Sequence, residues 1–192
     1  KNDKGGAGRL YLVTVVDVAT QFIVGYSIGR SETSELVQIA VQNAVKFCEG
    51  VAQEIRFDQG SANTAHDTTA MFDKLFKYVS AAGVKNPRSK TIEGNQGLFQ
   101  TKVLRYFENF AGLNITAKRK NSHVNEEHLA MLKKTKQLPT ESECAQQIAK
   151  AVVYWNNKTI QGERTRAHLQ FTDTHNRRAL SSLEMIDVFW QY

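Results

Sequence analysis

The sequence predicts an α/β fold, a mixed sheet flanked by helices, from two observations. Two β-branched runs, Leu10–Val16 and Phe22–Ile28, are separated by the short turn Asp17–Thr20, so they form an antiparallel hairpin. A later strand, Ile55–Phe57, is reached through a helical segment, which favours parallel pairing with a neighbour. Apolar residues on both faces of the first run place that strand inside the sheet.

The first predicted helix connects the hairpin to Ile55. Ser31 or Thr33 caps its start, and Gly50 stops it. Its apolar residues recur at helical spacing, which gives one buried stripe. The members of this stripe are Val37, Val41, Ala44 and Cys48.

Two further helices are expected in the middle of the chain. One is capped by Asp67 and ends at Gly83, and its buried residues are Phe72, Leu75, Phe76 and Val79. A short strand, Val84–Lys85, then stops before Pro87. The second helix runs from Thr91 to Phe110, and it packs through Phe99, Val103, Tyr106 and Phe110.

The last third of the chain contains one strongly marked helix. Thr140 and Glu143 form a capping box at its start. Ile148, Val152 and Trp155 supply its buried stripe. The sequence is polar from Gln161 until a short terminal helix, so we expect a domain over residues 1–160 and an extension over 161–192 that leads to a following domain.

Composition limits the classes of protein that fit. The 192 residues can bury one sizeable core, and the net charge of +6 permits a polyanionic partner. Residues 85–136 contain eleven Lys and Arg against four Glu, so the positive excess is concentrated there. Neither Cys48 nor Cys144 has a Cys or His partner at zinc spacing, and no apolar run reaches the roughly 20 residues of a membrane span. We therefore expect a cytoplasmic protein with no membrane partner.

Two carboxylates carry the candidate chemistry. Asp58 ends the third strand and Glu93 lies near the head of a helix. If the fold brings them together, they can bind hard divalent cations such as Mg²⁺ or Mn²⁺. Two such ions about 3.5–4 Å apart can stabilise both the attacking and the leaving oxygen of a phosphoryl displacement. We interpret Asp58 and Glu93 as catalytic residues and metal ligands.

The local strings resemble the catalytic core shared by retroviral-type integrases and bacterial transposases. The D-x-x-S/T hairpin of this family resembles residues 10–26, LYLVTVVDVATQFIVGY. Its second-aspartate motif resembles residues 57–63, FDQGSAN. The glutamate motif of phage Mu-type transposases resembles residues 90–100, KTIEGNQGLFQ. NFAGLNITAKRKNS (109–122) and the Tyr-Trp-Asn-Asn string at 154–157 are also similar to Mu-type transposases. The chain departs from the family pattern at Gly94, where an arginine usually follows the glutamate.

This resemblance implies an RNase H-like core over residues 1–160 and a DDE-type polynucleotidyl transferase that uses two Mg²⁺ or Mn²⁺ ions. It also implies that the first catalytic aspartate lies on a strand before the hairpin. Asp17 occupies the hairpin position, so it is a turn residue next to the site, and Asp3 lies in a glycine-rich segment that is no core strand. We expect that the first strand is missing here, and that an N-terminally extended chain cuts DNA while this one binds metal weakly.

Basic residues near Glu93 are candidates for DNA binding. Arg88 and Lys90 precede the glutamate, and Lys102 and Arg105 lie on an open side of its helix. Lys118, Arg119 and Lys120 form a run that suits phosphate contacts better than base readout. An ordinary solvated surface is the alternative for each of these groups.

The resemblance implies a transposase or integrase of a bacterial mobile element or prophage, which nicks DNA and joins the freed 3′-hydroxyl to a target by transesterification. Its partners would be element ends, target DNA and further copies of the chain in a homo-multimer. Two alternatives remain: an RNase H-like nuclease or resolvase that hydrolyses without joining, and a non-catalytic DNA-binding module that retains the fold.

Overall fold

An antiparallel hairpin begins the fold, as the sequence predicted. In the computed structural model, which describes residues 8–81, 89–110, 126–162, 164–172 and 176–190, β1 (Tyr11–Val16) pairs with β2 (Ile23–Gly29). Tyr11 lies opposite Gly29, and a bulge interrupts the register between Val15 and Val16. The predicted strand at 84–85 lies outside the described residues.

The helix α1 (Ser34–Cys48) follows the hairpin and confirms the predicted element. Thr33 is its N-cap, and the Thr33 side chain accepts a hydrogen bond from the backbone N–H of Leu36. Gly25 of β2 lies directly against the backbone of α1. A Cβ added at Gly25 would come within 2.4 Å of the Ala40 carbonyl oxygen and 2.5 Å of the Ala44 nitrogen. Only a residue without a side chain allows the strand and the helix to approach so closely.

A parallel strand pair forms the second part of the fold. Four elements precede its last strand: β3 (Val51–Ala52), β4 (Glu54–Phe57), α2 (Ser61–Thr64) and α3 (His66–Leu75). β4 then pairs in parallel with β5 (Tyr78–Ala81). The expected parallel pairing is confirmed.

The prediction of a helix that extends through Val79 to Gly83 was wrong. Phe76 already has extended backbone angles, φ −109° and ψ 140°. Val79 pairs with Ile55 of β4 instead of continuing the helix. The N-cap of α3 is Ala65, not Asp67, which lies in the first turn of the helix.

The second half of the chain begins with α4 (Ser89–Lys102) and the 3₁₀ helix η1 (Leu104–Tyr106). The predicted helix therefore starts earlier and ends earlier than Thr91–Phe110. α5 (Glu126–Lys134) and α6 (Glu141–Asn156) follow. The capping box at α6 is confirmed, since Thr140 Oγ1 accepts from the Glu143 N–H at 3.2 Å and Glu143 Oε2 accepts from the Thr140 N–H at 2.6 Å.

Several short elements occupy the C-terminal segment, which the sequence described only as polar with one helix. They are β6 (Thr159–Gln161), β7 (Arg164–Thr165), α7 (Arg166–Thr172), β8 (Arg177–Arg178) and α8 (Ser182–Phe189). β8 pairs with β3, and Val188 of α8 is buried in the same core cluster as α1 and α3. The predicted terminal helix is confirmed, and Trp190, which directly follows it, is 64% exposed.

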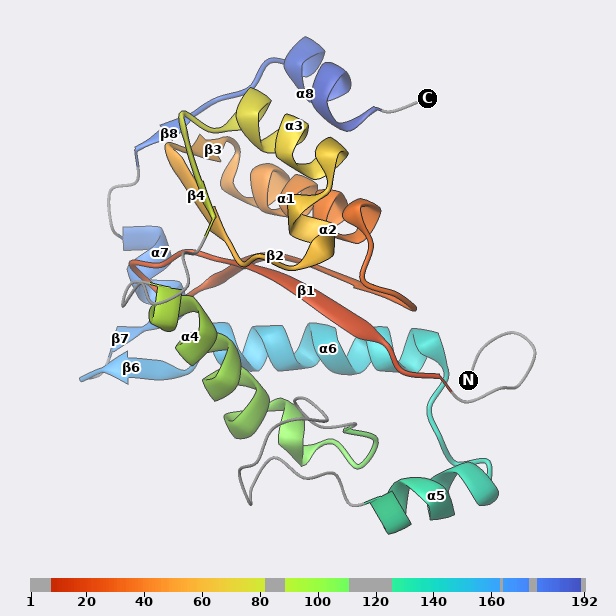
Figure 1. Ribbon diagram of the computed structural model, residues 1–192. Helices are drawn as coiled ribbons and strands as arrows, with labels where there is room; N and C mark the ends of the chain where they lie inside the picture. The colour runs from red at the N-terminus through yellow and green to blue at the C-terminus, as the bar shows by residue number, and fades with distance from the viewer. Residues whose placement is uncertain (1–7, 82–88, 111–125, 163, 173–175, 191–192) are drawn as a thin grey trace.

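The hairpin is the middle of three layers (Figure 1). Val13 and Val15 pack against the cluster that α1, α3 and α8 share, and this cluster also receives Ile55 and Phe57 of β4. Leu12 and Val16, which alternate with them along β1, pack against a second cluster formed with α4 and α6. Within the described residues, the β1–β2 and β4–β5 pairs are separate two-stranded sheets that share the first cluster.

Asn156, at the end of α6, completes the edge of β2. Its Oδ1 accepts from the Ile23 N–H at 2.9 Å, and its Nδ2 donates to the Ile23 carbonyl at 3.1 Å. One buried side chain therefore supplies the two hydrogen bonds that a neighbouring strand would otherwise provide.

Replacing Asn156 with leucine is expected to destabilise the chain by about 2–3 kcal/mol, because two buried backbone groups of Ile23 lose their partners. Urea unfolding monitored by circular dichroism measures this loss. The matched control is Asn157→Leu, since Asn157 is exposed and its side chain donates to the Val153 carbonyl within its own helix end. A control that loses as much stability as Asn156→Leu would contradict the explanation.

Candidate active site

Asp58 directly follows the C-terminal end of β4 and lies three residues before the start of α2. Its side chain is exposed, but its Oδ1 is held by two donors. The Gly60 N–H donates to this oxygen at 3.1 Å, and Asn63 Nδ2 donates to it at 2.5 Å. The first contact is an Asx turn, in which an aspartate bonds the backbone two residues on. The orientation of the carboxylate is thus set by one donor in its own loop, Gly60, and one in the following helix α2, Asn63.

The other oxygen of Asp58, Oδ2, has no hydrogen-bond or ion-pair partner among the described residues. An ionised carboxylate oxygen is the kind of ligand that Mg²⁺ and Mn²⁺ prefer, so the chemistry of this position fits a divalent ion. Among the described residues, however, no group of three or more His, Cys, Asp or Glu is placed to hold a metal.

Glu32 is a neighbour of Asp58 that no pattern in the sequence indicates. A Cβ built on Gly60 would lie 3.0 Å from Asp58 Oδ1 and 3.3 Å from Glu32 Oε1. Both carboxylates therefore border the space beside Gly60. Glu32 belongs to the turn between β2 and α1, and it is 26 residues before Asp58, so no local pattern relates the two.

Glu93 lies in α4, but its side chain is outside the described part of the chain. The described part of α4 is anchored to the hairpin and to α6. Thr14 Oγ1 of β1 donates to Gln96 Oε1 at 2.9 Å, and the ring of Phe99 meets Trp155 edge to face at 5.5 Å. Position 93 lies in the same helix, three residues before the anchored Gln96. The convergence of Asp58 and Glu93 stays a prediction.

Asp17 closes the turn of the hairpin. Its Oδ1 accepts from the backbone N–H groups of Ala19 at 2.9 Å and Thr20 at 3.4 Å. With the Gln170 amide oriented so that its nitrogen faces oxygen atoms, that nitrogen donates to Asp17 Oδ2 and to Thr20 Oγ1, and its oxygen accepts from Arg177. These contacts agree with the turn role expected for Asp17, and they tie the hairpin to α7 and β8.

Only part of the predicted DNA-binding set can be placed. Lys102 ends α4 and Arg105 lies in η1, and both side chains are exposed. Lys90 lies in α4 with a side chain outside the described part of the chain. Arg88, Lys118, Arg119 and Lys120 lie outside the described residues. Contact with DNA stays a prediction for all of them.

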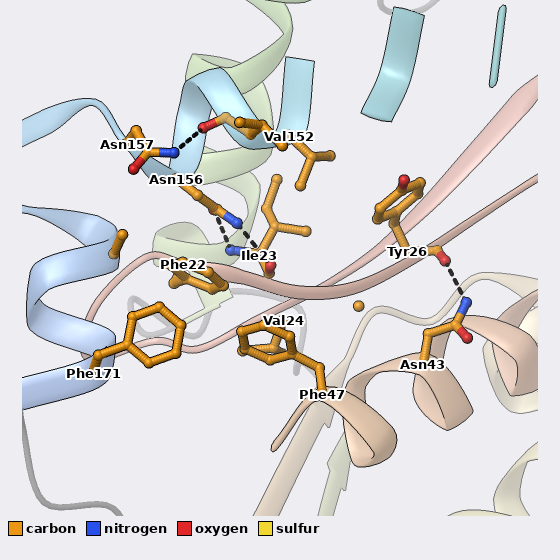
Figure 2. A pocket seen from close by; sticks show the side chains of 13 residues that line it. Phe22, Ile23, Val24, Tyr26, Asn43, Phe47, Val152, Asn156, Asn157 and Phe171 are labelled. Carbon is orange, nitrogen blue, oxygen red and sulfur yellow. Dashed lines mark hydrogen bonds between the residues drawn. The ribbon is translucent and has the colours of Figure 1, made fainter. Parts of the chain in front are cut away.

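An open hollow lies along the outer edge of β2, between α1, α6 and α7 (Figure 2). The rings of Phe22 and Phe47 are stacked at 5.3 Å, and Phe171 meets Phe22 edge to face at 6.0 Å. Asn43 donates to the Tyr26 carbonyl at 3.0 Å on the same edge. The lining contains neither a charged side chain nor Asp58, so this hollow is distinct from the candidate active site.

Comparison with known protein families finds a match for the first part of the chain. Residues 2–86 match a family model described as "Integrase core domain". The matched segment includes the hairpin with Asp17, helix α1 and the β4 loop with Asp58, and it ends before Glu93. No curated protein matches the chain.

The integrase core is an RNase H-like fold, and the predicted fold class is confirmed: the chain is a mixed α/β domain of that kind. The match supports the retroviral-integrase-like superfamily and, in general terms, an integrase- or transposase-type polynucleotidyl transferase domain that acts on DNA. Members of this superfamily generally use divalent metal ions. In the described part of the chain, no helix is both long and apolar enough to cross a membrane.

Proposed function

We propose that this chain is the catalytic domain of a DDE transposase or integrase from a bacterial mobile element or prophage, related to the phage Mu-type transposases. The observation that carries the proposal is the placement of Asp58. It lies in the segment matched by the integrase core, at the end of a parallel strand, with one oxygen held by two donors and the other facing no described partner.

In this proposal Asp58, Glu93 and an acid from a strand preceding the hairpin hold two Mg²⁺ or Mn²⁺ ions. When bound, such ions supply the charge that activates a hydroxyl nucleophile and stabilises the leaving oxygen of a phosphodiester. The chain itself positions the groups: Asp58 is held by its loop and by Asn63, and α4 is anchored at Gln96 and Phe99. No Ser or Tyr nucleophile is needed for direct transesterification.

The DNA contacts are proposed for the basic residues around α4. The side chains of Lys102 and Arg105 are exposed, as phosphate contacts require. Arg88, Lys90, Lys118, Arg119 and Lys120 would extend this surface along the DNA backbone. The protein would act in the bacterial cytoplasm, on the nucleoid, as a homo-multimer that brings element ends and target DNA together.

A joining assay with pre-nicked DNA ends tests the proposal. The protein extended at its N-terminus is expected to produce joined strands only with Mg²⁺ or Mn²⁺ present. Hydrolysis without joining would identify a nuclease or resolvase instead. Salt-sensitive DNA binding with neither product would identify a non-catalytic module, because phosphate binding alone explains the salt dependence.

A further inference from the structure

We propose that Asn63 is a positioning residue for Asp58: its amide fixes the carboxylate so that Oδ2 is presented to the metal. This inference rests on the proposed function, since it assigns a role within the same metal site. Asn63 Nδ2 lies 2.5 Å from Asp58 Oδ1, and the Gly60 N–H reaches the same oxygen at 3.1 Å. With both donors on one oxygen, the orientation of the other oxygen is set.

The amide of Asn63 can act as a rigid donor because its short helix is anchored in the core. Ala62, the preceding residue, is only 4% exposed and belongs to the cluster that α1 and α3 share. Its carbonyl accepts from the fully buried hydroxyl of Thr68 at 2.8 Å. The backbone at position 63 is therefore fixed although the side chain is exposed.

Asp58 needs such a donor because no packing holds it. An exposed aspartate samples several side-chain rotamers, and a metal ligand that must first be ordered binds with lower affinity. The Asx turn with Gly60 restrains one oxygen through the loop alone. The contact from Asn63 adds a restraint from a separate element, so that the carboxylate is bridged between the end of β4 and α2.

Gly60 provides independent support for this geometry. Its backbone angles, φ −59° and ψ 145°, suit any residue, so conformational freedom does not explain a glycine here. Space does explain it. A Cβ at this position would lie 3.0 Å from Asp58 Oδ1, 3.3 Å from Glu32 Oε1 and 3.6 Å from Asn63 Nδ2. The absent side chain leaves room for the contact between Asp58 and Asn63.

The test compares Mn²⁺ affinity with metal-free stability in the 192-residue chain. Free Mn²⁺ is measured by electron paramagnetic resonance during titration, and the thermal midpoint is measured in EDTA. Asn63→Leu keeps the size of the side chain and removes the donor. We expect it to weaken Mn²⁺ binding on the order of tenfold, as outer-shell partners of metal ligands typically do. Its metal-free midpoint is expected to stay within about 2 °C of wild type.

Three other variants separate the possible failures. Asp58→Asn is expected to abolish the Mn²⁺ binding, and the remote, exposed Asn157→Leu is expected to leave it unchanged. Wild-type affinity in Asn63→Leu, or a loss confined to its metal-free midpoint, would overturn the positioning role while Asp58→Asn still supports the metal site. Wild-type affinity in Asp58→Asn, or no binding by the wild type, would overturn the metal site and this inference together.

Gly60→Ala decides the question if Asn63→Leu does not fold. Alanine adopts the backbone angles of position 60 without strain, but its Cβ would lie 3.0 Å from Asp58 Oδ1, so the carboxylate must shift by a few tenths of an ångström. Weaker Mn²⁺ binding with an unchanged metal-free midpoint is the expected result. Unchanged Mn²⁺ binding would overturn the proposal, because the contact would then be irrelevant to the metal.

Discussion

Replacing Asp58 with asparagine is expected to reduce metal-dependent strand joining by roughly a thousandfold in the protein extended at its N-terminus. Metal ions contribute several kcal/mol of transition-state stabilisation, and about 1.4 kcal/mol corresponds to each factor of ten in rate. Asparagine keeps the shape of the side chain and an oxygen that can accept from the Gly60 N–H. It lacks the negative charge that a hard cation requires of its ligand. Joined product per unit time, measured with pre-nicked DNA ends, gives the effect.

Asp67→Asn is the matched control for this substitution. Asp67 is 64% exposed in the first turn of α3, with the exposed His66 as its ion-pair partner at 3.5 Å. The same chemical change there is expected to leave joining within twofold of wild type, since surface substitutions rarely matter. More than a tenth of the wild-type rate in Asp58→Asn would contradict the catalytic role.

Replacing Gly25 with alanine is expected to cost about 4 kcal/mol of stability, at the upper end for overpacking. The added Cβ would meet the Ala40 carbonyl oxygen, the Ala44 nitrogen and the Ala44 Cβ, all within 2.7 Å. Two of these are backbone atoms of α1, so no side-chain rotation can relieve the overlap. The helix must move away from β2, which opens the core beneath it. The thermal midpoint is expected to fall by roughly 10 °C.

Gly97→Ala provides the control for the Gly25 experiment. Gly97 lies inside α4, and a Cβ there would meet nothing within 4 Å. Alanine at that position is expected to raise stability by about 0.5–1 kcal/mol, because glycine is a poor helix former. If the two variants change stability in opposite directions, the close approach of β2 to α1 explains the glycine at position 25, rather than a general effect of replacing glycine. A stable Gly25→Ala variant would show that α1 and β2 are not packed as described.

The elements that the sequence predicted well are those specified by local patterns. The hairpin follows from two β-branched runs around Asp17–Thr20, and the capping box at Thr140 has a short and distinctive spacing. β5 was misassigned because Phe76 and Val79 continue a helical spacing from Phe72. Pairing with β4 decides their conformation, and this is a tertiary interaction that no window of sequence contains.

The candidate site also combines features set by local sequence with features set by tertiary contacts. The position of Asp58 at a strand end is local, so the sequence indicated it, and the Gly60 donor lies only two residues further on. The contact of Asn63 with Asp58 depends on how α2 turns back toward β4, which no local pattern specifies. The proximity of Glu32 to Gly60 results from the packing of two loops and has no signal along the chain. Glu93 and the basic run at 118–120 still rest on the sequence alone.

The bond between Thr20 and Gln170 spans 150 positions, and it has a consequence for synthesis on the ribosome. Thr20 is fully buried in the finished molecule. While the nascent polypeptide grows, its hairpin turn lacks the residues that cover it until α7 has left the exit tunnel. Contacts between distant parts of a chain also slow folding. The early strands therefore stay exposed to chaperones and to aggregation until the segment around Gln170 has been synthesised.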